Sequence, residues 1–214
     1  MAVIIILAIL FIDQAVKLWV KTSMSLSESI RITDWFYIYF IENNGMAYGM
    51  QIGSKLALSL FRMVAIGFLS YYIWQQVRKP GTKWGYIICL SMVLAGAAGN
   101  LIDCMFYGLC FDTSTYHNVS HYVGFGNGYA PFLMGKVVDM LYFPLIDTTY
   151  PEWFPWWAGE RFIFFSPIFN IADSSISVGV AALLLFYHKE ISHLSLRSRG
   201  VEESGSQGVE ESGS

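Results

Sequence analysis

Long apolar stretches separated by polar segments dominate this chain. Four of the stretches approach the roughly 20 residues that a helix needs to cross a hydrocarbon layer of ~30 Å. A helix is the open segment that satisfies its own backbone hydrogen bonds in lipid. The pattern therefore predicts a mainly α membrane protein with four transmembrane helices. The predicted spans are residues 2–20, 56–77, 84–102 and 167–188.

The first stretch could instead be a cleaved signal peptide. It has neither a basic start nor a small-residue cleavage site, and it carries Asp13 and Lys17. We therefore interpret it as a retained helix.

Basic residues in the short loops predict the orientation, because such residues stay in the cytoplasm. The clusters are Arg78, Lys79 and Lys83 after the second span, and Lys189, Arg197 and Arg199 after the fourth. They place both termini in the cytoplasm, although Lys17 and Lys21 at the other end of the first span oppose this assignment.

The two segments on the outer side have different patterns. Residues 21–55 alternate apolar and aromatic with polar positions around residues 35–40, which predicts a small sheet. Residues 103–166 form a long segment with aromatics expected at the headgroup level, Trp153, Phe154, Trp156 and Trp157. The tail, residues 191–214, repeats GVEESGS and is expected to be disordered and cytoplasmic.

The composition supports a membrane protein, with 55% hydrophobic and only 14% charged residues. The net charge of −3 comes from four glutamates in the tail, and no basic patch suggests nucleic acid. Cys89, Cys104 and Cys110 lack metal-site spacing. Cys104 and Cys110 could pair in an oxidising compartment, but separate thiols are the favoured interpretation.

Polar side chains inside apolar spans are costly and are therefore candidate functional residues. Asp13 and Lys17 are spaced i, i+4 and share one helix face, where a structural ion pair is the simplest interpretation. Asn100 and Asp103 share another face after a run of small residues, and could cap a helix-packing seam as well as belong to a site.

Asp139 follows the long outer segment, and Asn170 and Asp173 lie in the fourth predicted span. With that span starting at Pro167, Asp173 is expected roughly 9 Å inside it, at 1.5 Å per residue. Two carboxylates held close together share a proton, so one could activate water while the other polarises a peptide carbonyl. From the bare spacing alone, a chance encounter or a polar packing patch is a more frequent explanation than a catalytic pair.

Five motifs, taken in order, resemble those of the lipoprotein signal peptidase (signal peptidase II) family. They are Asp13-Gln14-x-x-Lys17, Asn43–Gly49 (NNGMAYG), Gly96–Asp103 (GAAGNLID), Gly135–Asp139 (GKVVD) and Phe169–Ser174 (FNIADS). The resemblance covers nearly all of residues 1–190.

The resemblance implies a single integral-membrane peptidase domain, residues 1–190, in the bacterial inner membrane. Its fold would be four transmembrane helices, a small extracytoplasmic β-cradle and a surface helix. The implied activity is an aspartic endopeptidase that cuts diacylglyceryl prolipoproteins before the lipidated cysteine. Membrane lipids surround such an enzyme, globomycin is expected to inhibit it, and neither a metal nor another cofactor is implied.

The resemblance also assigns roles to residues. Asp139 and Asp173 correspond to the catalytic pair. The pocket would be lined or supported by Asn43, Gly45, Asn100, Asp103 and Asn170, and braced by Asp13 and Lys17.

Two features depart from the family pattern. Cys104 stands where the family usually has an arginine, and residues 104–134 replace a usually short connection. We expect that insertion to form a lid or lipid-facing flap over the site.

Two other functions fit parts of the pattern. A small proton-coupled transporter would spread its acidic groups through the membrane depth and often shows internal repeats. A scaffold subunit with polar helix seams would tolerate Asp173→Asn.

Overall fold

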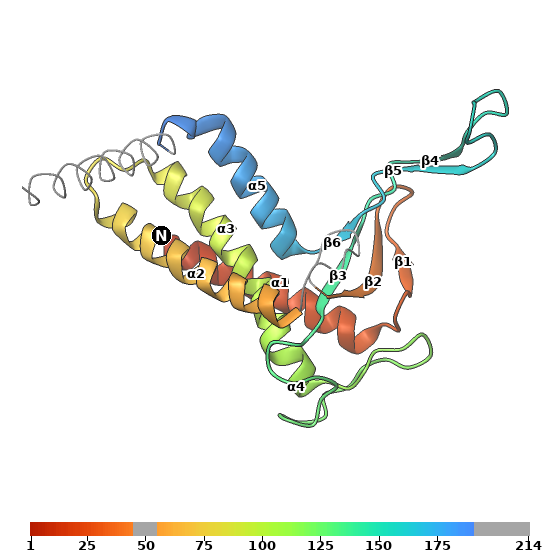
Figure 1. The fold of residues 1–214 in the computed structure, drawn as a ribbon, viewed down its shortest axis with the longest axis horizontal. Coiled ribbons are helices and arrows are strands. Elements are labelled where there is room, and N and C mark those ends of the chain that lie inside the picture. Colours follow the sequence, from red (N-terminus) through yellow and green to blue (C-terminus); the bar gives the residue numbers. More distant parts are fainter. Residues whose placement is uncertain (45–54, 191–214) are drawn as a thin grey trace, which may run out of the picture.

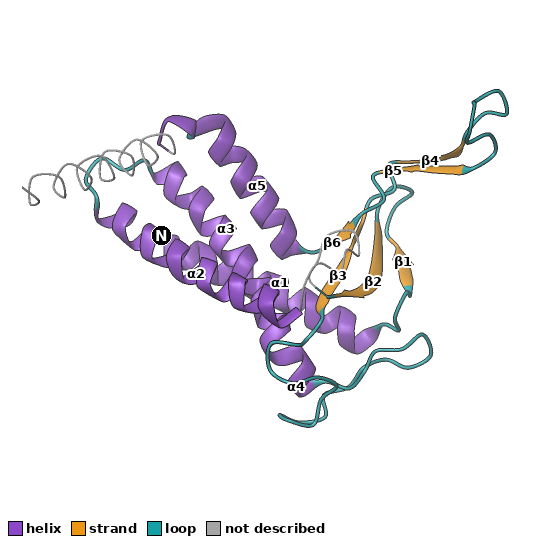
Figure 2. Cartoon of the chain, viewed as in Figure 1, coloured by secondary structure: helices purple, strands orange, loops and turns teal. Residues whose placement is uncertain are grey.

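The computed structural model describes residues 1–44 and 55–190. A bundle of four helices fills one half of the molecule, and the strands and the loops that follow α4 fill the other (Figures 1 and 2). The bundle helices are α1 (Ala2–Ser23), α2 (Lys55–Arg78), α3 (Trp84–Ile102) and α5 (Ile171–Phe186). The described residues include three apolar helices long enough to cross a membrane, namely α1, α2 and the helix that begins at Trp84. The first three predicted helices are therefore confirmed.

The fourth helix begins later than predicted. Residues 167–170 are not helical: Ile168–Phe169 form strand β6, and Asn170 is the N-cap of α5. Asp173 therefore lies in the first turn of its helix, not six residues inside it. The apolar residues before Asn170 pair with a strand, which a hydropathy pattern does not distinguish from a helix.

Helix α3 does not end at Ile102. It continues through a π-helical turn, Asp103–Tyr107, into a short helix α4, Gly108–Cys110. Such π-turns are frequent at functional sites. Within the part of the chain that the structure describes, these elements extend α3, and no separate surface helix is seen.

The predicted sheet at residues 21–55 is confirmed and gains strands from later in the chain. Strands β1 (Ser29–Arg31), β2 (Tyr37–Asn43), β3 (Val137–Tyr142) and β6 form an antiparallel sheet in the order β1-β2-β3-β6. Phe40, Val138 and Met140 share one core with Val20 of α1 and with Met24, the C-cap of that helix. This core attaches the sheet to the end of α1.

A second antiparallel pair, β4 (Ile146–Thr149) and β5 (Arg161–Phe164), forms an arm that projects from the sheet (Figure 1). Residues 150–160 connect its strands and contain the aromatic cluster noted in the sequence.

The insertion does not cover the candidate carboxylates as a lid. Ser114 donates a hydrogen bond of 2.7 Å to Glu42 on β2. Glu42 pairs with Val138, whereas Ile41 pairs with Asp139, so Glu42 and Asp139 point to opposite faces of the sheet. This contact places Ser114 against the face that packs on α1. Cys104 and Cys110 are both free thiols, as favoured from the sequence.

Candidate active site

Asp139 and Asp173 come together where the sheet meets the helix bundle. Asp139 is buried in β3, while Asp173 is half-buried at the third position of α5. Asn170 joins them: its Nδ2 donates to Asp139 Oδ1 at 2.6 Å, and its Oδ1 accepts from the Asp173 backbone N–H at 2.8 Å. The same asparagine thus caps α5, the helix that carries Asp173, and contacts the carboxylate of Asp139.

Two further amides hold the carboxylates. Asn43 donates to Asp139 Oδ2 at 2.8 Å, and Asn100 donates to Asp173 Oδ1 at 2.7 Å. Each carboxylate therefore accepts hydrogen bonds from neutral donors, which orient it without adding a charge.

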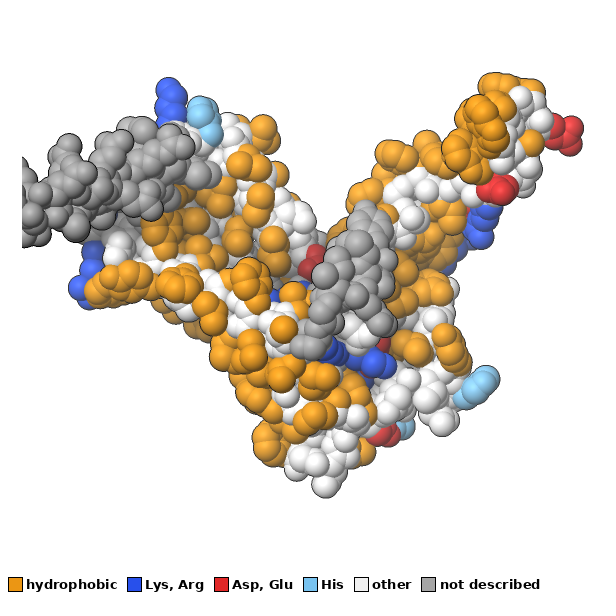
Figure 3. Space-filling view, in the orientation of Figure 1, with side chains coloured by type: hydrophobic (Ala, Val, Ile, Leu, Met, Phe, Trp, Pro, Cys, Tyr) orange, Lys and Arg blue, Asp and Glu red, His pale blue; other side chains and the backbone are white. Residues whose placement is uncertain are grey.

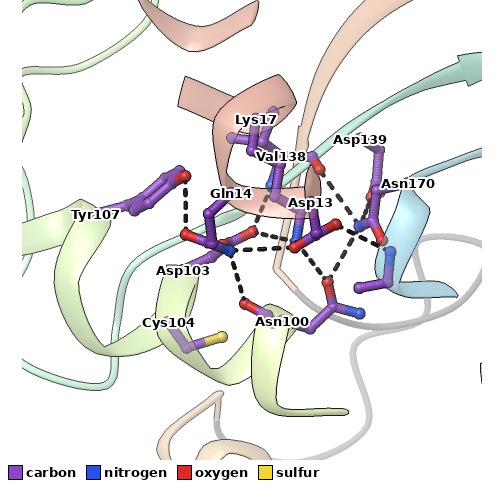
Figure 4. A network of polar contacts seen from close by, with 12 residues as sticks. Asp13, Gln14, Lys17, Asn100, Asp103, Cys104, Tyr107, Val138, Asp139 and Asn170 are labelled. Carbon is purple, nitrogen blue, oxygen red and sulfur yellow. Dashed lines mark hydrogen bonds and ion pairs between the residues drawn. The ribbon is translucent and has the colours of Figure 1, made fainter. Parts of the chain in front are cut away.

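A buried lysine lies at the centre of the supporting network (Figure 4). Lys17 Nζ lies 3.0 Å from Asp13 Oδ2, 2.9 Å from Asp103 Oδ2 and 2.9 Å from Asn100 Oδ1. The ion pair expected between Asp13 and Lys17 is present, and Asp103 joins it. Buried charges need such pairing and hydrogen bonding to offset desolvation.

The two supporting aspartates make equivalent contacts with the backbone. Asp103 Oδ2 accepts from the N–H of Val138 at 3.2 Å, and Asp13 Oδ1 accepts from the N–H of Ala172 at 2.9 Å. Each of those residues directly precedes one of the carboxylates in question, Asp139 or Asp173. Because Lys17 binds both supporting aspartates, it links the strand and the helix that carry the pair.

The two carboxylates have different surroundings. Burial and the nearby charge of Asp173 raise the pKa of Asp139 to about 7, against the weaker effects of hydrogen bonds from Asn43 and Asn170. Burial disfavours the charged form, and a second carboxylate disfavours it further. The pKa of Asp139 thus lies near neutral pH, where part of its population keeps the proton.

The structure brings together all of the sequence-predicted site residues that it describes. Gly45 lies outside the described residues. Cys104, at the position where the family usually has arginine, contacts Arg62 of α2, whose Nη1 lies 3.7 Å from its Sγ.

Three contributors were missed in the sequence. Gln14 donates to Asp103 Oδ1 at 2.9 Å and accepts from Tyr107 at 3.2 Å. Gln14 is an amide inside an apolar span, so the cost of burying polar groups could have identified it. Lys21 and Glu42 form a second buried ion pair at 2.7 Å, on the face of the sheet opposite Asp139.

No group of three or more His, Cys, Asp and Glu side chains with the arrangement of a metal site occurs in residues 1–44 and 55–190. A carboxylate pair at the edge of a helix bundle is an arrangement suited to acid–base chemistry.

The fold and this site define a multi-pass membrane protein with a carboxylate pair held by amides. A family model described as signal peptidase (SPase) II matches residues 5–189. The chain belongs to the signal peptidase II family and is a membrane-embedded peptidase.

Similar proteins include a lipoprotein signal peptidase of Porphyromonas gingivalis (strain ATCC 33277), 47% identical over 190 residues, with 89% of this chain and 84% of that protein covered. A lipoprotein signal peptidase of Amoebophilus asiaticus (strain 5a2) is 35% identical over 184 residues, covering 81% of this chain and 72% of that one.

A similar fold occurs in a bacterial membrane enzyme solved by the in meso method at 2.3 Å resolution. It superimposes with a TM-score of 0.60 at 22% identity, and the alignment covers 90% of each chain. A second such structure, solved at 1.9 Å, gives a TM-score of 0.56 at 22% identity, with 86% of this chain and 90% of that one covered.

Proposed function

We propose that this protein is an aspartic endopeptidase that removes the signal peptide from diacylglyceryl-modified prolipoproteins, cutting before the lipidated cysteine. The observation that carries the proposal is the carboxylate pair itself. Asp139 and Asp173 are linked through Asn170 and have unequal surroundings, in a member of a family whose relatives are named lipoprotein signal peptidases.

In the proposed mechanism, Asp139 starts protonated and Asp173 starts ionised. Asp173 takes a proton from a water molecule, whose oxygen attacks the scissile carbonyl carbon. Asp139 donates its proton to the carbonyl oxygen, which forms a neutral tetrahedral intermediate. When the carbon–nitrogen bond breaks, the amine leaves with the proton from Asp173 and Asp139 recovers its own.

The supporting residues would position the pair. Asn43, Asn100 and Asn170 would orient the carboxylate oxygens, and the Asp13–Lys17–Asp103 network would fix β3 relative to α5. Small displacements matter, because catalytic groups must be held close to the reacting geometry.

We further propose that α5 is the fourth span and that both termini are cytoplasmic in the bacterial inner membrane. This orientation puts the carboxylate pair on the extracytoplasmic side, beside membrane lipids. The diacylglyceryl group of the substrate would hold the scissile bond at this surface. A globomycin-type inhibitor is expected to block the site.

A cleavage assay tests the proposal. Purified protein is given a diacylglyceryl-modified prolipoprotein, and the loss of the signal peptide is followed by gel shift. Asp139→Asn and Asp173→Asn should each lower the rate by at least roughly a thousandfold, because each variant lacks one proton-transfer group. Asp34→Asn is the matched control, since Asp34 is exposed and pairs with Arg31 away from the site. Near-normal cleavage by either site variant would remove that residue from the mechanism.

A further inference from the structure

In the sequence, the arm formed by β4 and β5 lies between Asp139 and Asp173, the two candidate carboxylates. It leaves the sheet after β3, which contains Asp139, and returns through β6, which is followed directly by Asn170 and α5. Strands β3 and β6 also pair with each other, Leu141 with Phe169 and Tyr142 with Ile168. A contact made by the arm can therefore affect the position of both β3 and β6, the strands that lead to the candidate site.

The connection at the end of the arm carries exposed aromatic side chains. Trp153, Trp156 and Trp157 are 78%, 86% and 49% exposed. The rings of Tyr150 and Phe154 stack with centroids 5.0 Å apart, which gives the connection a packed aromatic base. Large exposed apolar surfaces of this kind mark sites of interaction with a protein or a membrane.

Trp156 has a conformation that its own side chain disfavours. Its φ is +76°, in the left-handed region that glycine adopts without a steric penalty. The side chain is almost fully exposed, so it contributes little to the core. A tryptophan at this position is therefore better explained by an external contact than by folding.

The position of the arm favours the membrane as that contact. In Figure 1 the arm extends sideways, transverse to the axes of the bundle helices. Figure 3 shows hydrophobic side chains along its upper side and charged side chains along its lower side and end. The hydrophobic side of the arm thus faces the direction in which the bundle extends.

The length of α5 supports the same placement. Its 16 residues span about 24 Å, less than the ~30 Å of a hydrocarbon layer. If α5 is the fourth span, as proposed above, its first turn and the root of the arm lie at the hydrocarbon boundary. Tryptophan and tyrosine are enriched at that depth, where their rings meet both apolar chains and polar headgroups.

We propose that the β4–β5 arm lies on the outer surface of the bilayer, with Trp153, Trp156 and Trp157 among the phospholipid headgroups. Because both ends of the arm continue into the strands of the site, this contact sets the height of Asp139 and Asp173 above the hydrocarbon.

Tryptophan fluorescence in vesicles tests the contact without any substrate. The full chain is reconstituted in phosphatidylcholine vesicles brominated either near the headgroup end or near the terminus of the acyl chains. Subtracting the emission of the triple variant Trp153→Ser/Trp156→Ser/Trp157→Ser from that of the wild type isolates the three tryptophans of the arm. We expect this difference signal to be quenched more strongly by the shallow bromines. Equal emission in brominated and plain vesicles would overturn the proposal.

A cleavage comparison tests the consequence. Trp156→Gly removes the side chain and also relieves the backbone, so a lower thermal stability is not expected. In vesicles this variant should raise KM by about tenfold, the order of effect of one lost aromatic contact. In detergent micelles it should match the wild type, and Trp156→Tyr should behave like the wild type in both.

The outcomes separate the two proposals. If Trp156→Gly raises KM in micelles as well as in vesicles, and the arm tryptophans are not quenched, the arm binds the substrate polypeptide. That result would overturn the membrane contact. If the wild type does not cleave at all, the proposed function fails, while the quenching experiment still decides whether the arm lies on the membrane.

Discussion

At the scale of single residues, the two candidate carboxylates lie in different surroundings. Asp139 is buried and Asp173 is half-buried, and the charge of one acts on the other. Two carboxylates in different surroundings can act as acid and base at one pH. The polar contacts that the structure gives them come from neutral amides, so the supporting charges of Lys17, Asp13 and Asp103 act one step away.

The raised pKa of Asp139 predicts an alkaline limit to activity. Its carboxyl group is protonated below about pH 7 and loses the proton as the pH rises through that value. If Asp139 must start protonated, kcat/KM should fall above about pH 7. The Asn43 hydrogen bond favours the ionised form, so Asn43→Ala should raise the pKa of Asp139 and move this limit to higher pH. The pH profiles of the two proteins measure the shift; an unchanged or lower limit in Asn43→Ala would show that Asp139 does not set it.

The sequence was sufficient to select most residues of the candidate site. Asp13, Lys17, Asn100 and Asp103 could be selected because polar groups in apolar helices are expensive. Asn170 could be selected for the same reason, although it caps the helix instead of lying within it. The contacts themselves could not be predicted. For example, the hydrogen bond from the Val138 N–H to Asp103 depends on how β3 packs against the end of α3. Nothing in the local sequence of either element specifies that packing.

At the scale of the elements, apolar length identified three helices well and the fourth only in part. The predicted start of the fourth helix was wrong because Ile168 and Phe169 are apolar for a different reason: they belong to strand β6, which pairs with β3. The insertion was also misinterpreted as a lid. Its contact with Glu42 joins residues far apart in sequence, and such non-local contacts leave no periodic signal.

Close packing of α3 against α5 supplies a test at this scale. A Cβ atom on Gly96 would collide with the carbonyl oxygen of Ala172 and lie 2.6 Å from Ile176 Cγ1. Gly96→Ala should therefore push α5 away from α3, cost about 1–3 kcal/mol and move Asp173 from its partners. We expect a large fall in kcat together with a lower Tm.

Gly67 in α2 is the matched control for that variant. A Cβ there meets nothing within 4 Å, so Gly67→Ala should keep full activity and a Tm at or above that of the wild type. Normal cleavage by Gly96→Ala would show that the separation of α3 and α5 does not control the site.

At the scale of the whole molecule, a second buried network joins parts of the chain that hydropathy treats as separate. Lys21 at the end of α1 contacts Glu42 of β2 at 2.7 Å and Ser114 of the insertion at 3.0 Å. Lys136, directly before β3, contacts Glu42 at 3.1 Å. The pKa of Glu42 stays below its ordinary value: burial alone would raise it, but the two lysines favour the charge. Helix, sheet and insertion are thus held by one carboxylate.

This arrangement predicts an asymmetric response to substitution. Glu42→Gln leaves the fully buried Lys21 without its counter-charge and should destabilise the protein by about 3–5 kcal/mol. The double variant Lys21→Met/Glu42→Leu removes both charges and should recover most of the lost stability, because a buried ion pair is often replaceable by apolar residues of similar size. Lys136 is partly exposed and can turn toward water in the double variant. Thermal unfolding in one detergent measures all three proteins. If the double variant is as unstable as Glu42→Gln, the carboxylate matters for its hydrogen bonds to the insertion more than for the charge of Lys21.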